Sequence, residues 1–251
     1  MKTVVAPGRG SEIIRLDLVE LADGETWAQS GAGEWAVVVL SGEVDVTLAG
    51  EDRGRAGGRK SVFDGPGHAV YAPPGCSVRL TARGPVELAA ASAPVDGRAA
   101  GEARIIGPQD QRLAEVGRDN WTRSVRTILG PEQAAGRLLL GETINPPGNW
   151  SSYPPHRHDR QSPPDEVRLE EVYLYKVDPA GGFGVQLRYD DTGTEEASLV
   201  RDDDAVAIRA GYHPVVAAPG YSLYYLWVMA GDGREMIPHL DPRHAWVQQG
   251  R

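Results

Sequence analysis

Short runs of apolar and β-branched residues, separated by glycine and proline, constrain the fold of this chain most strongly. The stretch "WAVVVLSGEVDVTLAG", residues 35–50, predicts two strands joined by a turn at Ser41-Gly42. The stretch "HAVYAPPGCSVRLTA", residues 68–82, predicts a strand, a Pro-Pro-Gly turn and a second strand. The same rhythm continues over residues 137–231, and a helical period is almost absent. We therefore expect an all-β chain built as a sandwich or barrel.

The two halves of the chain repeat one pattern. "GEWAVVVLSGEVDV", from residue 33, and "LEEVYLYKVDPAGGFGVQL", from residue 169, each place a glutamate before an apolar or aromatic strand. Further on, "AVYAPPGCSVRL" matches "AVAIRAGYHPVV", which aligns Gly75 with Gly211 and Ser77 with His213. A stretch rich in glycine, proline and charge, at about residues 94–120, reads as a connector. We expect two β-barrel domains, residues 1–110 and 111–251.

Charge and composition exclude several classes of function. The net charge of −9 argues against nucleic acid and anionic membranes as partners, because both bind basic surfaces. No apolar run approaches the roughly 18 residues of a membrane span, and the N-terminus lacks the apolar core of a secretion signal. A single cysteine, Cys76, is typical of a reducing compartment. We expect a soluble cytoplasmic protein, and its strand edges are compatible with a homo-oligomer.

Two histidines stand one residue apart in "SSYPPHRHDR", although the chain holds only six. Side chains alternate between the faces of a strand, so His156 and His158 point the same way and Arg157 points away. The two prolines before His156 stiffen the approach, which lowers the entropy lost in fixing the pair. Such pairs also occur by chance in loops, so the motif needs further support.

Two more residues supply that support. Glu171 opens an aromatic strand, and His213 follows Gly211-Tyr212 in the second half of the repeat. Three neutral imidazoles and one carboxylate form a good site for a divalent first-row metal. In the first half, Glu34 and Ser77 stand at the matching positions and no histidine pair precedes Glu34. We expect the first domain to be a barrel without metal ligands.

The stretches "NPPGNWSSYPPHRHD", "EEVYLYKV" and "GYHPVVAAPGYSLYYLWVMAG" resemble the two motifs of the cupin superfamily. Along essentially the whole chain, the sequence more closely resembles the 5-deoxy-glucuronate isomerase family, bicupin enzymes of myo-inositol catabolism. A related family, the 4-deoxy-5-keto-uronate isomerases, shares the metal motif but has a shorter segment between the second histidine and the glutamate. The long "DRQSPPDEVRLE" stretch therefore favours the inositol-pathway family.

The resemblance implies two tandem cupin barrels of the double-stranded β-helix, or jelly-roll, type. It implies the metal ligands His156, His158, Glu171 and His213, with Glu171 chosen over Glu170 by the register of the family motif. It also implies an aldose–ketose isomerase that converts 5-deoxy-D-glucuronate, a small uronic acid, into 2-deoxy-5-keto-D-gluconate. The cofactor expected from it is a divalent metal ion: zinc, or manganese, iron or nickel.

Three residues are candidates for catalysis. Tyr173 shares the face of Glu171 and is a candidate proton carrier, and an aromatic ring that fills the barrel core is the favoured alternative. Arg188 has the forked donors that suit a substrate carboxylate, and a surface arginine is the alternative. Glu142 precedes the first ligand strand and could line the chamber. An enediol and a hydride-shift mechanism both remain open, as do two other functions: a cupin dioxygenase and a non-catalytic sugar-acid-binding cupin.

Overall fold

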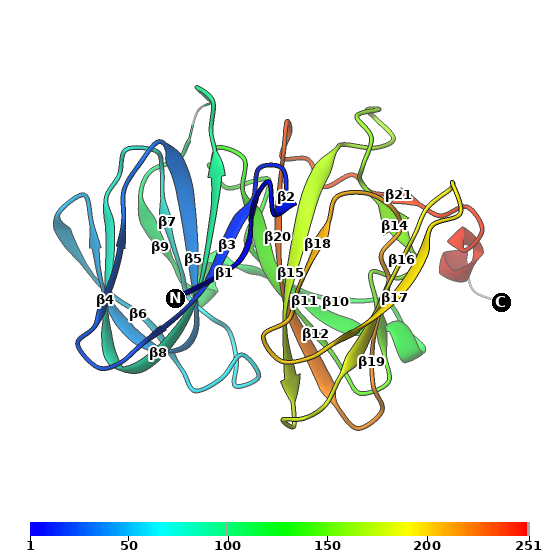
Figure 1. Ribbon diagram of the computed structural model, residues 1–251, viewed down its shortest axis with the longest axis horizontal. Coiled ribbons are helices and arrows are strands. Elements are labelled where there is room, and N and C mark those ends of the chain that lie inside the picture. The colour runs from blue at the N-terminus through cyan, green and yellow to red at the C-terminus, as the bar shows by residue number, and fades with distance from the viewer. Residues whose placement is uncertain (99, 250–251) are drawn as a thin grey trace. The chain divides into compact units, whose positions relative to one another are not determined.

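The computed structural model describes residues 1–98 and 100–249, and they divide into two compact units (Figure 1). One unit comprises residues 1–112 and 128–140, and the other comprises residues 113–127 and 141–251. The first boundary lies close to the predicted one after residue 110. Residues 128–140, however, group with the first unit although they follow that boundary in the chain. None of the described helices is long and apolar enough to cross a membrane.

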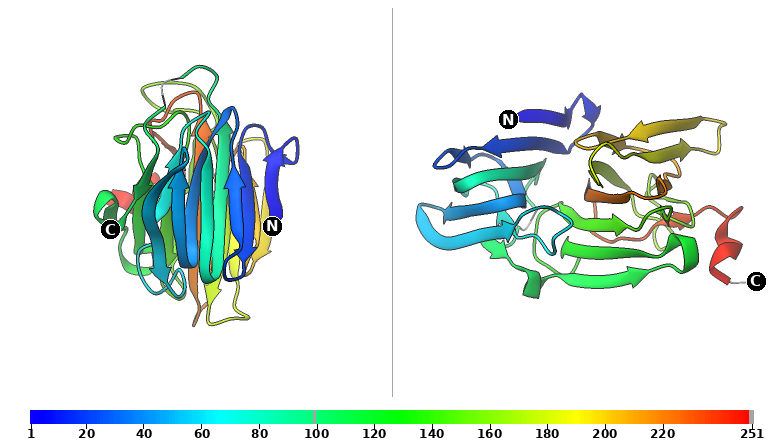
Figure 2. Two further views of the ribbon diagram at one scale, coloured as in Figure 1. Left: turned by 90° about the vertical axis from the view of Figure 1, so that its left-hand side faces the viewer. Right: turned by 90° about the horizontal axis from the view of Figure 1, so that it is seen from below.

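The first unit is built from one antiparallel-rich sheet, whose blue and cyan strands lie side by side in the left view of Figure 2. Its central strands are β5, β8 and β3, and β5 contributes the longest row of buried residues. The strands of this unit are β1 (Lys2–Pro7), β2 (Gly10–Ser11), β3 (Arg15–Leu21), β4 (Thr26–Gln29), β5 (Gly33–Leu48), β6 (Glu51–Arg59), β7 (Ala69–Ala72), β8 (Val78–Pro94) and β9 (Arg104–Ile106), followed by the 3-10 turn η1 (Pro108–Asp110).

The second unit carries the later part of the repeat on two main sheets and one strand pair. The order is β10-β11-β12-β20-β15-β18 in one sheet and β13-β19-β16-β17 in the other, and β14 pairs with β21. The elements are β10 (Arg112–Val116), η2 (Asp119–Trp121), β11 (Arg123–Leu129), β12 (Leu139–Asn145), β13 (Trp150–Ser151), β14 (His156–Arg157), β15 (Leu169–Asp178), β16 (Gly184–Tyr189), β17 (Glu195–Val200), β18 (Ala205–Ile208), β19 (Val215–Ala217), β20 (Ser222–Gly231), β21 (His239–Leu240) and η3 (Ala245–Gln249).

The predicted turn at Ser41-Gly42 is wrong, because residues 33–48 form one continuous strand. The pairing of β5 with β8 shifts register on either side of Ser41, and Gly42 has a φ of +82°, so an extra residue bulges out of the ladder. Trp35, Val37 and Val39 belong to the hydrophobic core before the bulge, and Val44, Val46 and Leu48 belong to it after the bulge. The bulge therefore changes the inward-facing set from odd to even positions.

Residues 128–140 belong to the first unit because Glu34 binds them. Glu34 is fully buried at the start of β5. Its carboxylate accepts hydrogen bonds from the backbone N–H groups of Gly136, Arg137 and Leu138, at 2.8, 2.6 and 2.7 Å. The Tyr71 hydroxyl donates a fourth, at 2.7 Å. Four donors satisfy the buried charge, which would otherwise be costly in the interior.

We predict that Glu34→Ala lowers the free energy of unfolding by about 3–5 kcal/mol, because it leaves four buried donors without their acceptor. Urea denaturation followed by tryptophan fluorescence measures the change. The control is Glu43→Ala, which removes a half-exposed carboxylate 3.4 Å from Arg55 and should cost less than about 1 kcal/mol. Equal losses in the two variants would contradict the proposed role of Glu34.

Candidate metal centre

Three histidines from different segments of the second unit converge. His156 lies in β14, His158 follows that strand directly, and His213 precedes β19. One potential ligand atom of each ring lies within 4.8 Å of those of the other two. The centroid of the His213 ring is 4.9 Å from that of His156 and 5.0 Å from that of His158.

Backbone carbonyl groups orient these rings. Nδ1 of His158 lies 2.7 Å from the Leu169 oxygen, and Nδ1 of His213 lies 3.0 Å from the Gly211 oxygen. His156 makes a comparable hydrogen bond to the backbone of Pro154. Because a carbonyl oxygen only accepts, each bonded ring nitrogen carries a proton, and in the neutral ring the second nitrogen keeps its lone pair. Histidines that bind a metal through one ring nitrogen commonly donate the N–H of the other to a backbone carbonyl in this way.

Glu171 supplies a carboxylate to the cluster. Its Oε2 lies 3.1 Å from Nε2 of His158 and 3.2 Å from Nε2 of His213. Burial opposes ionisation of Glu171, yet contacts with the two imidazoles lower its pKa to about 2. Burial also favours neutral His158, but the Glu171 carboxylate outweighs it and raises the pKa of that ring. Glu171 therefore faces the histidines.

Burial dominates at His156, which lacks so close a carboxylate. Burial first, and then the neighbouring rings of His213 and His158, lower its pKa to about 3. The ring is therefore neutral at physiological pH, as a metal ligand must be. Neutral His156 beside the anionic Glu171 gives the cluster donors of two kinds, nitrogen and oxygen, that suit first-row divalent ions.

The donor set fits a metal ion. Nε2 of His213 is buried and, although Glu171 Oε2 lies 3.2 Å away, makes no well-oriented hydrogen bond. Such a nitrogen is costly to bury unless something else binds it. With metal–nitrogen bonds of about 2.0–2.1 Å, tetrahedral ligand atoms stand roughly 3.4 Å apart. The ligand atoms of the three rings, within 4.8 Å of one another, need only small movements to reach that spacing. The ion's presence itself stays a prediction.

A cavity of about 60 Å³ adjoins the cluster. His156, His158 and Glu171 form its polar side, and Met229, Met236, Ile237 and Pro238 contribute to its apolar side. The apolar wall keeps the imidazoles away from bulk water, which strengthens electrostatic interactions there. Met236 is 40% exposed, so this wall reaches the molecular surface.

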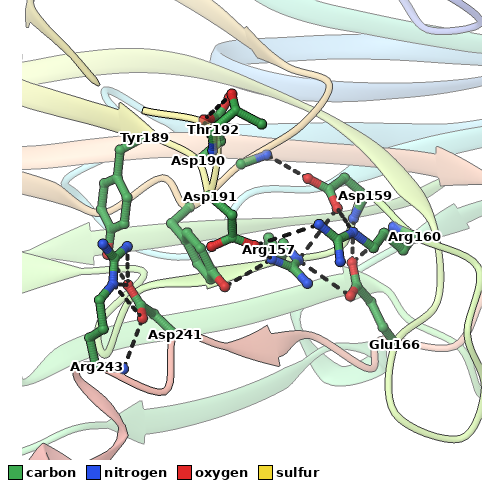
Figure 3. A network of polar contacts seen from close by, with 12 residues as sticks. Arg157, Asp159, Arg160, Glu166, Tyr189, Asp190, Asp191, Thr192, Asp241 and Arg243 are labelled. Carbon is green, nitrogen blue, oxygen red and sulfur yellow. Dashed lines mark hydrogen bonds and ion pairs between the residues drawn. The ribbon is translucent and has the colours of Figure 1, made fainter. Parts of the chain in front are cut away.

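Arg157, itself buried, lies in a network of charged side chains (Figure 3). Its guanidinium lies 2.6 Å from Asp191, 3.4 Å from Glu166 and 3.5 Å from Asp159. It also donates a hydrogen bond to the Tyr212 hydroxyl, at 2.9 Å, and stacks over that ring. Only 6% of Arg157 is exposed, so several acceptors are needed to satisfy the charge.

The contacts of Arg157 join the segments that carry the imidazoles. Tyr212 directly precedes His213, and Asp159 directly follows His158. The Asp159 carboxylate in turn accepts the N–H of Gly211, at 2.8 Å. Glu166 accepts the N–H groups of residues 159 and 160, both at 2.8 Å, which ties the stretch before β15 to the histidine strand. Sequence reasoning missed this network, although the acidic residues of "DRQSPPDEVRLE" were its signal.

Tyr173 lies beside the cluster. Its ring centroid is 6.1 Å from that of His213 and 4.4 Å from that of Tyr225. Its hydroxyl shares a hydrogen bond of 2.8 Å with Ser152. Burial, reinforced by the Glu171 charge, raises the pKa of Tyr173 well above its usual value. The phenol therefore stays protonated at neutral pH, so it suits a proton donor better than a base.

The structure does not bring the other two catalytic candidates to the histidines. Arg188 is paired with the Glu196 carboxylate, and Nη1 of Arg188 donates to the Ala207 oxygen at 3.4 Å. Its side chain is 36% exposed, so the surface alternative describes it better. Glu196 lies directly opposite Arg188 in the β16–β17 ladder, so the arginine forms a cross-strand ion pair instead of entering the chamber.

Glu142 lies on the opposite face of its sheet. Its carboxylate accepts a hydrogen bond from the Tyr224 hydroxyl, at 2.9 Å. The next residue, Thr143, bonds instead to Tyr225, which packs against Tyr173 on the chamber side. Successive side chains on a strand point to opposite faces, so Glu142 is directed away from the histidines. The contact with Tyr224 therefore does not place Glu142 in the chamber, where it was expected.

A model of the KduI/IolB family matches residues 2–247. The chain belongs to the KduI/IolB family. A 5-deoxy-glucuronate isomerase of Geobacillus kaustophilus (strain HTA426) is 39% identical over 245 residues, 96% of this chain and 88% of the relative. The 5-deoxy-glucuronate isomerase of Bacillus subtilis (strain 168) is 33% identical and is matched over 93% of this chain and 87% of its own length. The family resemblance predicted from the motifs is confirmed.

Solved structures agree with the all-β fold. The crystal structure of an IolB-like protein from Salmonella typhimurium LT2 has a TM-score of 0.93 at 34% identity, covering 97% of this chain and 94% of its own. A Bacillus subtilis oxalate decarboxylase has a TM-score of 0.64 at 11% identity, covering 92% of this chain and 71% of its own, and this likeness shows the fold alone. The KduI/IolB chain described here is therefore a two-cupin protein, as its motifs predicted.

We predict that Arg157→Met lowers the free energy of unfolding by about 3–5 kcal/mol, because it leaves buried carboxylates without their cation. Arg188→Met is the matched control, since it removes an arginine from a partly exposed pair and should cost less than about 1 kcal/mol. Urea denaturation of both variants measures the difference. Similar losses would show that the network around Arg157 contributes no more than a surface ion pair.

Proposed function

We propose that this protein is a metal-dependent aldose–ketose isomerase that converts 5-deoxy-D-glucuronate into 2-deoxy-5-keto-D-gluconate in myo-inositol catabolism. The observation that carries the proposal is the convergence of three imidazoles. Each has one nitrogen bonded to the backbone, which leaves the other nitrogen to bind a metal ion. Relatives named 5-deoxy-glucuronate isomerase, 33–39% identical over nearly the whole chain, support the substrate. We also infer a cytoplasmic location, which the single cysteine supports.

His156, His158, His213 and Glu171 would hold the ion, in the second unit only. An ion of zinc, manganese, iron or nickel would supply positive charge that stabilises negative charge developing on the substrate oxygens as a carbon-bound proton is removed. In the first unit, Glu34 is occupied by backbone N–H groups and Tyr71. We therefore infer that the first unit is a barrel without a metal, as its lack of paired histidines predicts.

The residues around the cluster would handle the protons. Tyr173, kept protonated by burial and positioned by Ser152, is placed to donate a proton to a substrate oxygen. The apolar wall of Met229, Met236 and Ile237 would exclude water from the reacting carbons. No net redox change accompanies an aldose–ketose conversion, so the proposed reaction needs no second cofactor.

We predict that His156→Ala and His213→Ala each abolish metal retention and reduce turnover at least about 100-fold, because each removes a donor to the ion. Elemental analysis gives the metal content, and circular dichroism checks that the β fold persists. His68→Ala, a histidine of the first unit, is the control and should keep both metal and activity. Near-normal turnover of either ligand variant would refute the assignment.

We predict that a strong chelator removes activity from the wild-type protein and that one of the four divalent ions restores it. Turnover is followed by NMR with 5-deoxy-glucuronate in deuterium oxide, where label at the acceptor carbon indicates an enediol rather than a hydride shift. Oxygen uptake by the iron-loaded protein would support the dioxygenase alternative instead. Binding of the uronate without turnover would support the non-catalytic alternative.

A further inference from the structure

Arg123, at the start of β11, is a buried cation without an anionic partner. Only 9% of it is exposed. Its Nη1 donates to the carbonyl oxygens of Trp121 and Tyr153, both at 3.2 Å, and its buried Nε has no hydrogen-bond partner. Within the part of the chain that the structure describes, no carboxylate forms an ion pair with it. Burial lowers the pKa of Arg123, but a guanidinium remains charged at neutral pH.

Two other buried arginines, Arg157 and Arg59, are better satisfied. Arg157 faces three carboxylates, as Figure 3 shows. Arg59 donates its Nε to the carbonyl oxygens of residues 39 and 40, at 3.2 and 3.0 Å. A buried guanidinium with an orphaned Nε is costly, and proteins keep such a group where an anion completes it. Arg123 therefore has donor capacity that the protein itself does not use.

The position of Arg123 relates it to the histidine cluster. Its positive charge lowers the pKa of the buried Tyr225, against the larger effect of burial, which raises it. Tyr225 packs on Tyr173, whose ring lies 6.1 Å from that of His213. The Tyr153 oxygen that Arg123 binds lies three residues before His156. The unpaired cation therefore acts on Tyr225, which packs against Tyr173 beside the candidate metal centre.

We propose that Arg123 binds the carboxylate of the sugar-acid substrate. This inference rests on the proposed function, in which a six-carbon acid presents its carbonyl group to the ion. The reacting carbonyl and the carboxylate lie at opposite ends of that molecule, so its recognition requires a cation at a distance from the ion. The fork of donors on a guanidinium matches a carboxylate, and the pairing would satisfy the orphaned Nε. Arg123 takes the role that the sequence had assigned to Arg188, which is engaged by Glu196.

Steady-state kinetics with 5-deoxy-glucuronate and with its uncharged primary amide test the proposal. For Arg123→Met we expect a KM for the acid that is about 10- to 100-fold higher, with metal content unchanged. The preference of the wild-type protein for acid over amide should disappear in this variant. Arg123→Lys keeps the charge but not the fork, and should recover part of the preference. Arg188→Met is the matched control and should leave KM unchanged.

A KM for the acid that stays within about twofold in Arg123→Met, with the acid–amide preference intact, would overturn the proposal. If Arg123→Met does not fold, Arg123→Lys decides: an unaltered preference overturns the proposal and a reduced one supports it. Calorimetric titration of the wild-type and variant proteins with the acid and the amide separates this inference from the proposed function. A wild-type protein that binds the acid through Arg123 without isomerising it would refute only the isomerase; equal binding of acid and amide would refute the role of Arg123.

Discussion

The candidate centre depends on one constraint: each imidazole donates a hydrogen bond from one N–H group to a nearby backbone carbonyl. The oxygens of Leu169 and Gly211, and the backbone of Pro154, fix the three rings. Because an N–H group bonded outward leaves the other nitrogen as an acceptor, the rings present lone pairs to one another and to Glu171. Such a group of acceptors repels itself unless a cation or a shared proton joins it, and the resulting site is poised for a metal ion.

Charges buried elsewhere in the chain show how the fold satisfies them. Glu34 and Glu171 occupy matching places in the repeat, yet Glu34 is surrounded by backbone N–H groups and Glu171 by imidazoles. The partners, rather than the glutamate, decide whether the position binds backbone or is available to an ion. The buried cation of Arg157 is likewise satisfied by its partners, three carboxylates from the segments that it joins. Arg123 has no such partner of opposite charge, which is why a negatively charged ligand is inferred there.

Local pattern predicted much of this. Strand alternation placed His156 and His158 on one face and Arg157 on the other, and the structure has them so. The four side chains named as ligands lie together, and their binding of an ion stays a prediction. Local pattern failed at two places. The predicted turn at Ser41-Gly42 is a bulge within one strand. Glu142, expected to line the chamber, lies on the sheet face opposite to that of Thr143. An inserted residue reverses the sheet face of every side chain that follows it in the strand, and the local sequence pattern does not predict where the insertion lies.

The sequence by itself determined the all-β character, the repeat, the family and the residue types that can bind a metal, because these depend on spacing along the chain. Only the tertiary structure decided which charges are partnered. Arg188 and Arg123 look equally available in the sequence, yet one meets Glu196 across a ladder and the other meets carbonyl groups in the interior. Residues 128–140 likewise join the first unit because their N–H groups reach Glu34, about 100 positions earlier. Ion pairing and burial depend on distances in space between segments that are far apart in sequence, and composition and periodicity carry no information about those distances.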